Sequence, residues 1–106
     1  MLPNRRQDTR RTSNLPVEIC IGSQVTIAGQ LKDISLKSAF IQMKSSVYMQ
    51  INDELNFLIK CSSHESEDSV SGVARISRIL TGEGIAIYFT RIDDASMSRL
   101  QALIAQ

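Results

Sequence analysis

The chain contains few of the residues from which metal, redox and catalytic sites are usually built. Its 106 residues include two cysteines, one histidine and no tryptophan, and aromatic residues make up only 5%. Cys20 and Cys61 lie far apart and form no CxxC pair, which argues against a zinc ribbon or a redox motif. Two cysteines so far apart in the sequence favour a reducing compartment over a disulfide scaffold. We therefore interpret both as small strand residues.

Long apolar runs are also missing. No stretch approaches the ~18 apolar residues of a membrane span, and the basic start MLPNRRQDTRRTSN lacks the apolar segment of a secretory signal. We therefore expect a cytoplasmic protein without membrane insertion. A length of 106 residues suits one domain, and 42% hydrophobic with 22% charged residues is ordinary for a globular protein.

An enzyme has little support in this sequence. His64 is the single histidine, and it lies in the polar, serine-rich segment SSHESEDS at 62–69, which we expect to be a solvated loop. The acidic residues of the same segment, Glu65, Glu67 and Asp68, lack the spacing and the glycine of a calcium-binding loop. We predict no catalytic residue, no metal site and no cofactor.

Positive charge is concentrated at one end of the chain. The first eleven residues hold four arginines and one aspartate, whereas the remainder holds eight basic and ten acidic residues. A basic arm on a mildly acidic body favours a local anion site over a long nucleic-acid track. We place the flexible arm at residues 1–14 and a folded domain at residues 15–106.

Most of the domain consists of short segments typical of β-strands, in which apolar and polar residues tend to alternate. The predicted strands are Leu15–Ile21, Gln24–Ser35, Ala39–Lys44, Glu54–Cys61, Val70–Leu80 and Ile85–Thr90. No helix-length segment separates them, so antiparallel pairing in an all-β barrel or sandwich is expected. Closure of the sheet would also remove exposed strand edges.

Glycines mark the expected turns. Gly22-Ser23 is a plausible two-residue hairpin connection, and residues 82–84 (GEG) form a second turn. Gly29, inside a predicted strand, indicates a bulge or a close backbone approach.

The end of the chain is predicted to be a helix. Asp93 or Asp94 can cap its N-terminus, and apolar residues follow at helical spacing: Met97, Leu100, Leu103 and Ile104. Such a short helix is unstable alone, so its apolar stripe should dock on the barrel or on a partner.

Two stretches carry binding chemistry. The first is RRQDTR at residues 5–10, followed by Arg11; guanidinium groups bind phosphate in a bidentate manner and stack on flat rings. The second is DISLKS at residues 33–38, where Asp33 and Ser35 would share one face of an extended strand and could read the donor edge of a guanine. Taken singly, the first could be a solvated basic tail, and the second a strand-end turn closed by side-chain hydrogen bonds.

Together, the two stretches resemble the PilZ domain family. The pattern of that family is RRxxxR in an N-terminal arm, a strand, and then (D/N)xSxxG at the end of the next strand. Here RRQDTR matches the first motif at Arg5, Arg6 and Arg10, and DISLKS matches the second at Asp33 and Ser35. The later segments GVARIS and GIAIYF and the terminal helix also fit, so the resemblance covers nearly the whole chain.

The resemblance implies a six-stranded antiparallel β-barrel with a C-terminal α-helix that binds the bacterial second messenger cyclic di-GMP on its outer surface. By this analogy, Arg6 and Arg10 would hold phosphates and stack on guanine. Asp33 and Ser35 would contact a guanine base and position the arm. Arg5 occupies the position at which, in related proteins, an arginine is associated with the binding of two intercalated ligand molecules in place of one. Signalling to a downstream protein partner in motility or biofilm control is then expected.

One position departs from the family pattern, because Ser38 stands where the motif has glycine. If that position required positive φ, a serine there would cost roughly 1–2 kcal/mol. Strain present in both the free and the bound protein would lower stability and leave affinity unchanged. The serine side chain could also block close approach of the ligand.

Two alternatives stay open at this point. Ser38 favours a degenerate PilZ-like protein-interaction adaptor that does not bind the nucleotide. A barrel that binds single-stranded nucleic acid would need stacking aromatics interleaved with basic residues on its strands. The few aromatics here, three of them set among apolar positions, give that reading little support, and we expect no nucleic-acid partner.

Overall fold

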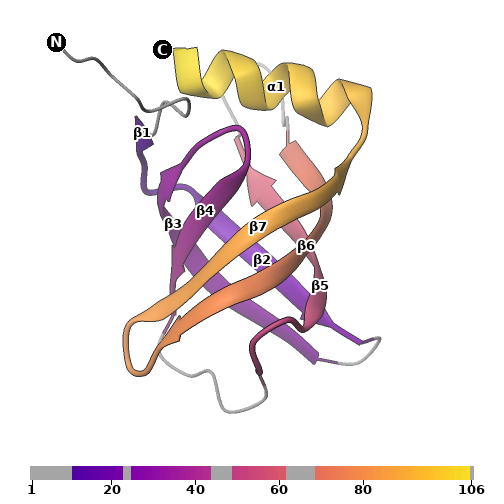
Figure 1. Cartoon of the computed structure of the whole chain (residues 1–106). Coiled ribbons are helices and arrows are strands. Elements are labelled where there is room, and N and C mark those ends of the chain that lie inside the picture. The colour runs from indigo at the N-terminus through magenta and orange to yellow at the C-terminus, as the bar shows by residue number, and fades with distance from the viewer. Residues whose placement is uncertain (1–10, 23–24, 44–48, 62–68, 106) are drawn as a thin grey trace, which may run out of the picture.

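The computed structural model describes residues 11–22, 25–43, 49–61 and 69–105. Its elements are β1 (Arg11–Thr12), β2 (Pro16–Ile21), β3 (Val25–Ile34), β4 (Ser38–Gln42), β5 (Glu54–Lys60), β6 (Ser69–Leu80), β7 (Gly84–Ile92) and α1 (Asp94–Ala105). Six strands form an antiparallel ring in the order β3-β2-β5-β6-β7-β4, and β4 pairs back onto β3 to close the barrel. The two residues of β1 pair with the end of β3, and α1 lies across one end of the barrel (Figure 1). The predicted six-stranded barrel with a C-terminal helix is confirmed.

Alternation along the strands builds the core. In β5 the residues Leu55, Phe57 and Ile59 are buried while Glu54, Asn56 and Lys60 are exposed, as the period of two predicts. The inward side chains of all six barrel strands meet in one cluster. Its largest fully buried members are Ile19, Leu31, Ile34, Ile41, Leu55, Ile59, Ile76, Ile85, Ile87 and Leu100.

Apolar and polar residues do not keep one regular alternation along the β6 sequence, and the reason is two irregularities in its pairing with β7. The register shifts between Val73 and Ala74, and again between Ile76 and Arg78. Ser77 is the extra residue at the second shift, so Ile76 and Ile79 both pair with inward isoleucines of β7 despite their spacing of three. A bulge therefore explains why no single alternation fits this segment.

Some predicted boundaries were wrong. Ile21 pairs with Val25, so the strands are not joined by the two-residue hairpin expected at Gly22. Residues 23–24 lie outside the described part of the chain. β4 covers Ser38–Gln42, because Ser38 pairs with Tyr88 in β7. Ser69 is the first residue of β6 and not part of the loop predicted at 62–69, since it pairs with Lys60; residues 62–68 are not described.

The close approach predicted at Gly29 is confirmed. A Cβ atom at this position would lie 2.7 Å from the backbone oxygen of Gln42 and 2.9 Å from a side-chain methyl of Ile41. The register shift between β3 and β4 lies further along, between Leu31 and Asp33. Gly29 therefore allows β4 to lie against β3 where the barrel closes.

The terminal helix docks as predicted. Of the two candidate caps, Asp93 is the one that accepts a hydrogen bond from the backbone N–H of Ser96, at 2.7 Å. Leu100 is fully buried in the barrel core, and the buried Ser96 hydroxyl accepts a hydrogen bond from the backbone N–H of Ser71 in β6 at 3.1 Å. The rest of the predicted stripe is half-buried against the same core: Met97, Leu103 and Ile104. No helix in the described part of the chain is long and apolar enough to cross a membrane.

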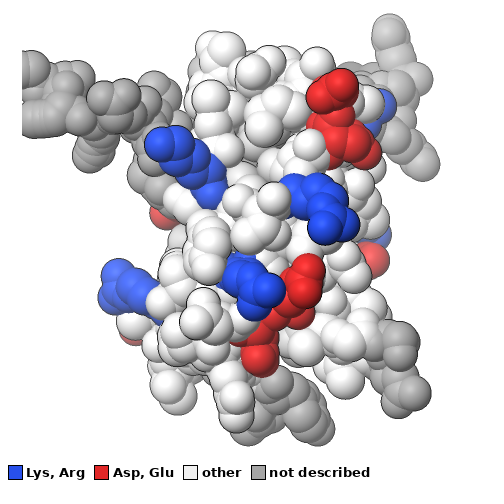
Figure 2. All heavy atoms as spheres, turned by 45° about the vertical axis from the view of Figure 1, so that its right-hand side comes forward, with Lys and Arg blue, Asp and Glu red and all other residues white. Residues whose placement is uncertain are grey.

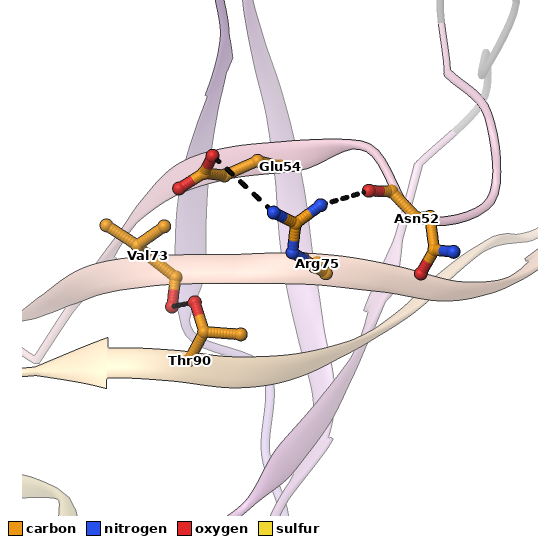
Figure 3. A network of polar contacts seen from close by, with 5 residues as sticks. All are labelled: Asn52, Glu54, Val73, Arg75 and Thr90. Carbon is orange, nitrogen blue, oxygen red and sulfur yellow. Dashed lines mark hydrogen bonds and ion pairs between the residues drawn. The ribbon is translucent and has the colours of Figure 1, made fainter.

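The turn before β5 holds the one described non-glycine residue with positive φ, Asn52 at 76°. The backbone N–H of Asp53 bonds to the Gln50 carbonyl at 3.0 Å, which closes the turn. Arg75 of β6 donates to the Asn52 carbonyl at 2.8 Å and forms a 3.9 Å ion pair with Glu54 (Figure 3). The same figure shows Thr90 bonding to the Val73 carbonyl across the β6–β7 pair at 3.1 Å.

This turn gives a test of local stability. We expect Asn52→Val to unfold about 1–2 kcal/mol more easily than Asn52→Gly, because a branched side chain is strained at positive φ and glycine is not. Urea denaturation of both variants measures the difference. Equal stabilities would mean that residue 52 does not adopt the left-handed conformation.

Candidate functional site

The predicted DISLKS motif forms the end of β3, a tight turn and the start of β4. Ser35 comes directly after β3 and is fully buried. Its hydroxyl oxygen accepts hydrogen bonds from the backbone N–H groups of Lys37 and Ser38, both at 3.2 Å. The backbone N–H of Ser35 donates to the Ser38 carbonyl at 2.8 Å. The Ser35 side chain therefore closes the turn and fixes the course of the backbone around it.

This arrangement corrects one geometric expectation. Because β3 ends at Ile34, Asp33 and Ser35 are not alternate residues of one extended strand. Asp33 is half-buried next to the fully buried Ile34, and it pairs with Phe40 in β4, so it lies on the outer face of the barrel. Ser35 is turned inward at the turn. The predicted contact of both residues with a guanine stays a prediction.

The arm joins the barrel at this same motif. In β1, Arg11 pairs with Ile34 and Thr12 pairs with Asp33, although these partners are more than twenty residues apart in the sequence. The connection continues along β3, where the backbone N–H of Ser13 donates a hydrogen bond to the Lys32 carbonyl at 2.9 Å. β1, the strand that follows the arm arginines in the sequence, therefore lies against Asp33. The arginines Arg5, Arg6 and Arg10 lie outside the described residues, as does the rest of the arm to residue 10.

Ser38, which replaces the glycine of the motif, is in regular strand backbone. It is the first residue of β4, pairs with Tyr88, and is not among the described residues with positive φ. Its hydroxyl oxygen lies 3.4 Å from that of Ser35. The strain considered for a serine at this position is therefore absent.

Sequence reasoning gave no role in this site to the two aromatic residues beside the motif. Tyr88 is 38% exposed and lies directly across from Ser38, while Phe40 is half-buried across from Asp33. The alternation of Ile85, Ile87 and Phe89 was the available signal, because it assigns Tyr88 to the outer face.

A pocket of about 410 Å³ lies next to Tyr88. Its lining includes the turn residues Leu36 and Lys37 together with Arg91 and Met97. The described residues that line it include two cations and no carboxylate. This composition suits a ligand with both flat apolar and anionic parts.

A second pocket of about 500 Å³ lies between β3, the end of β4 and the β6–β7 turn. Its described lining, which includes Ile27, Gln30, Gln42 and Met43, contains no charged residue. The described lining therefore supplies no cation for a phosphate and includes no residue of either motif.

Basic groups on the face seen in Figure 2 stand apart from one another, separated by uncharged surface, and some lie beside acidic groups. Lys60 pairs with Glu18 at 3.0 Å, and Arg75 pairs with Glu54. The described barrel surface in this view thus offers isolated cations and no continuous basic track. Such a surface suits a small anion better than a nucleic-acid strand.

The sequence and the structure agree with those of a known class of regulatory binding domains. The family model for the PilZ domain matches residues 4–106, and the chain belongs to this family. No protein with a curated description matches the sequence.

Solved structures of the same fold come from several bacteria. The inhibitor of motility MotI/DgrA of Bacillus subtilis superimposes with a TM-score of 0.81 at 18% identity over 97% of this chain, which spans only half of that protein. The PilZ domain of YcgR from Escherichia coli, solved with c-di-GMP, gives 0.75 at 14% identity and covers 96% of this chain and 90% of that one. The PilZ domain of CeSA from a cellulose-synthesizing bacterium gives 0.64 at 21% identity, covering 91% and 94%.

Proposed function

We propose that this PilZ domain binds cyclic di-GMP through Arg5, Arg6 and Arg10 of the arm together with Asp33, Ser35 and Ser38 of the barrel. The observation that carries the proposal is the pairing of β1 with the end of β3. It attaches the arginine-bearing segment to the barrel at Asp33, beside the turn that Ser35 closes. The residues that directly follow RRQDTR in the sequence, Arg11 and Thr12, thus pair with the strand that carries Asp33.

The chemistry of the two parts is complementary. Arginines supply bidentate, permanently charged donors for the two phosphates of the ligand, and Asp33 supplies an acceptor for the donor edge of guanine. The similar fold of the YcgR domain, which was solved with c-di-GMP, supports the same ligand class.

In this proposal the protein is a cytoplasmic sensor without enzymatic activity. Ordering of the arm over the ligand presents a new surface to a downstream protein partner, in motility or biofilm control. The likeness to the Bacillus inhibitor of motility supports the motility branch of this proposal.

Isothermal titration with cyclic di-GMP tests the proposal. We expect saturable binding by the wild type and an affinity roughly 10- to 100-fold lower for Arg10→Ala, since one charge-assisted hydrogen bond contributes about 1.5–3 kcal/mol. Lys60→Ala is the matched control: it also removes one positive charge, but from β5, on the opposite side of the ring from β4. It should bind as the wild type does.

The absence of any heat or spectral shift at high micromolar ligand would overturn the proposal. It would instead favour the nucleotide-independent adaptor, whose capture of a partner should be indifferent to added cyclic di-GMP and to substitutions in the arm.

A further inference from the structure

Three outward-facing residues of neighbouring strands lie in one row beside the motif. Ser38 in β4 pairs with Tyr88 in β7, and Tyr88 pairs with Arg75 in β6. Directly paired residues of an antiparallel sheet extend their side chains to the same face. Ala39 and Ile87, the neighbours of Ser38 and Tyr88 in their strands, are buried in the core, so this row lies on the outside of the barrel.

A second row lies alongside it, two residues away on β4 and on β7. It contains Asp33, Phe40 and Ala86, paired in that order across β3, β4 and β7. Phe40 and Tyr88 are therefore diagonal neighbours on one surface, a spacing that aromatic side chains can bridge.

Tyr88 also borders the pocket of about 410 Å³ described above. Tyr88 thus pairs with Ser38 of the motif and also lines a pocket that carries Lys37 and Arg91. A tyrosine that keeps 38% of its surface exposed in this setting presents apolar area to solvent. The free protein gains little from that exposure, whereas a flat aromatic ligand would cover it.

We propose that Tyr88 is a base-stacking residue of the nucleotide site, with Phe40 extending the stacking surface and with Lys37 and Arg91 attracting the phosphates. This inference rests on the proposed binding of cyclic di-GMP and adds a ligand-contacting residue outside the two motifs. The ring contributes a contact that every purine can make, while Asp33, in the adjoining row, discriminates the hydrogen-bonding edge of the base.

Affinity measurements separate stacking from other roles of the side chain. We expect Tyr88→Ala and Tyr88→Leu to bind cyclic di-GMP roughly 5- to 100-fold more weakly, the range that corresponds to one lost base–aromatic stack. Tyr88→Phe keeps the ring and should retain wild-type affinity. Leucine fills a comparable apolar volume but has no π-face. The Tyr88→Leu variant therefore distinguishes ring stacking from simple burial of apolar surface under the ligand.

A matched control is available in the turn before β5. Ile51 is 54% exposed there and is not among the lining residues of the pocket beside Tyr88, and Ile51→Ala removes an exposed apolar side chain in the same way. Its affinity should equal that of the wild type. Stacking is not a charge interaction, so the loss in Tyr88→Ala should be the same at low and high salt, unlike the effect of an arm arginine.

Tyrosine fluorescence provides a direct readout. The chain has no tryptophan and only two tyrosines, Tyr48 and Tyr88, so Tyr88 is the sole tyrosine emitter in the variant Tyr48→Phe. Stacking of guanine on the ring should quench this emission in a saturable way, with the midpoint found by titration calorimetry.

The possible outcomes separate the two proposals. If the wild type binds cyclic di-GMP, but Tyr88→Ala and Tyr88→Leu bind equally well and Tyr88 emission does not change, the stacking inference is overturned and the proposed function stands. If Tyr88→Phe loses as much affinity as Tyr88→Ala, the hydroxyl makes the contact and stacking is again overturned. If the wild type does not bind at all, both proposals fall.

Discussion

The double variant Arg6→Ala/Arg10→Ala should lose cyclic di-GMP binding almost completely. Each charge-assisted contact is worth about 1.5–3 kcal/mol, so loss of two lowers the affinity by roughly 10²- to 10⁴-fold if the contributions add. Both residues precede β1, so the barrel and its thermal unfolding should be unchanged. Titration calorimetry, with circular dichroism to verify the fold, measures both quantities.

The matched control keeps the charge and changes only its geometry. Arg6→Lys/Arg10→Lys retains two cations but loses the planar, bidentate guanidinium groups. We expect affinity between those of the wild type and the alanine variant, with a similar dependence on salt. If the double alanine variant binds as tightly as the wild type, the arm does not hold the ligand.

A second large effect is expected at Gly84, where β7 begins against β4. A Cβ atom here would overlap the carbonyl oxygen of Ile41 and lie 2.9 Å from Cα of Gln42. These are backbone atoms and cannot move aside as a flexible side chain does. We expect Gly84→Ala to destabilise the fold by about 3 kcal/mol, at the upper end of what overpacking usually costs, because the β4–β7 pairing must shift.

Gly82, in the same turn, is the control. It has positive φ of 82°, but an added Cβ would meet nothing within 4 Å. Gly82→Ala should therefore cost only the backbone strain, about 1–2 kcal/mol. Urea denaturation of both variants compares them; if Gly84→Ala were no less stable than Gly82→Ala, β4 and β7 would not approach each other as described. Because Ser38 and Tyr88 depend on this pairing, Gly84→Ala should also weaken ligand binding.

The strands were predictable wherever one face of a strand is buried along its whole length. In β5 the alternation of Leu55, Phe57 and Ile59 with polar residues gave the strand and its buried face. In β6 the same reasoning failed to give a phase, because the extra residue Ser77 is accommodated by a bulge that only the partner strand reveals. The loop assignment of Ser69 failed for a similar reason, since pairing with Lys60 extends the strand.

The two proposed binding motifs were visible in the sequence, but their geometry was only partly so. The resemblance to the PilZ family is confirmed, and the roles of Asp33 and Ser35 that it implies stay a prediction. Local sequence could not show that Ser35 turns inward to close the turn, because this depends on where β3 ends. Nor could the local sequence show that Ser38 does not adopt positive φ, since its backbone conformation follows from the pairing with β7.

The sequence by itself determined the family, the barrel with its capped terminal helix, and the arm with its concentrated charge, because these depend on local composition, periodicity and motif order. Only the tertiary structure decided what lies next to what. The β1–β3 pairing brings the arm to Asp33, and the β4–β7 pairing sets Tyr88 beside Ser38. These neighbours are distant in sequence, and their meeting is fixed by strand register and barrel closure, which no local pattern specifies.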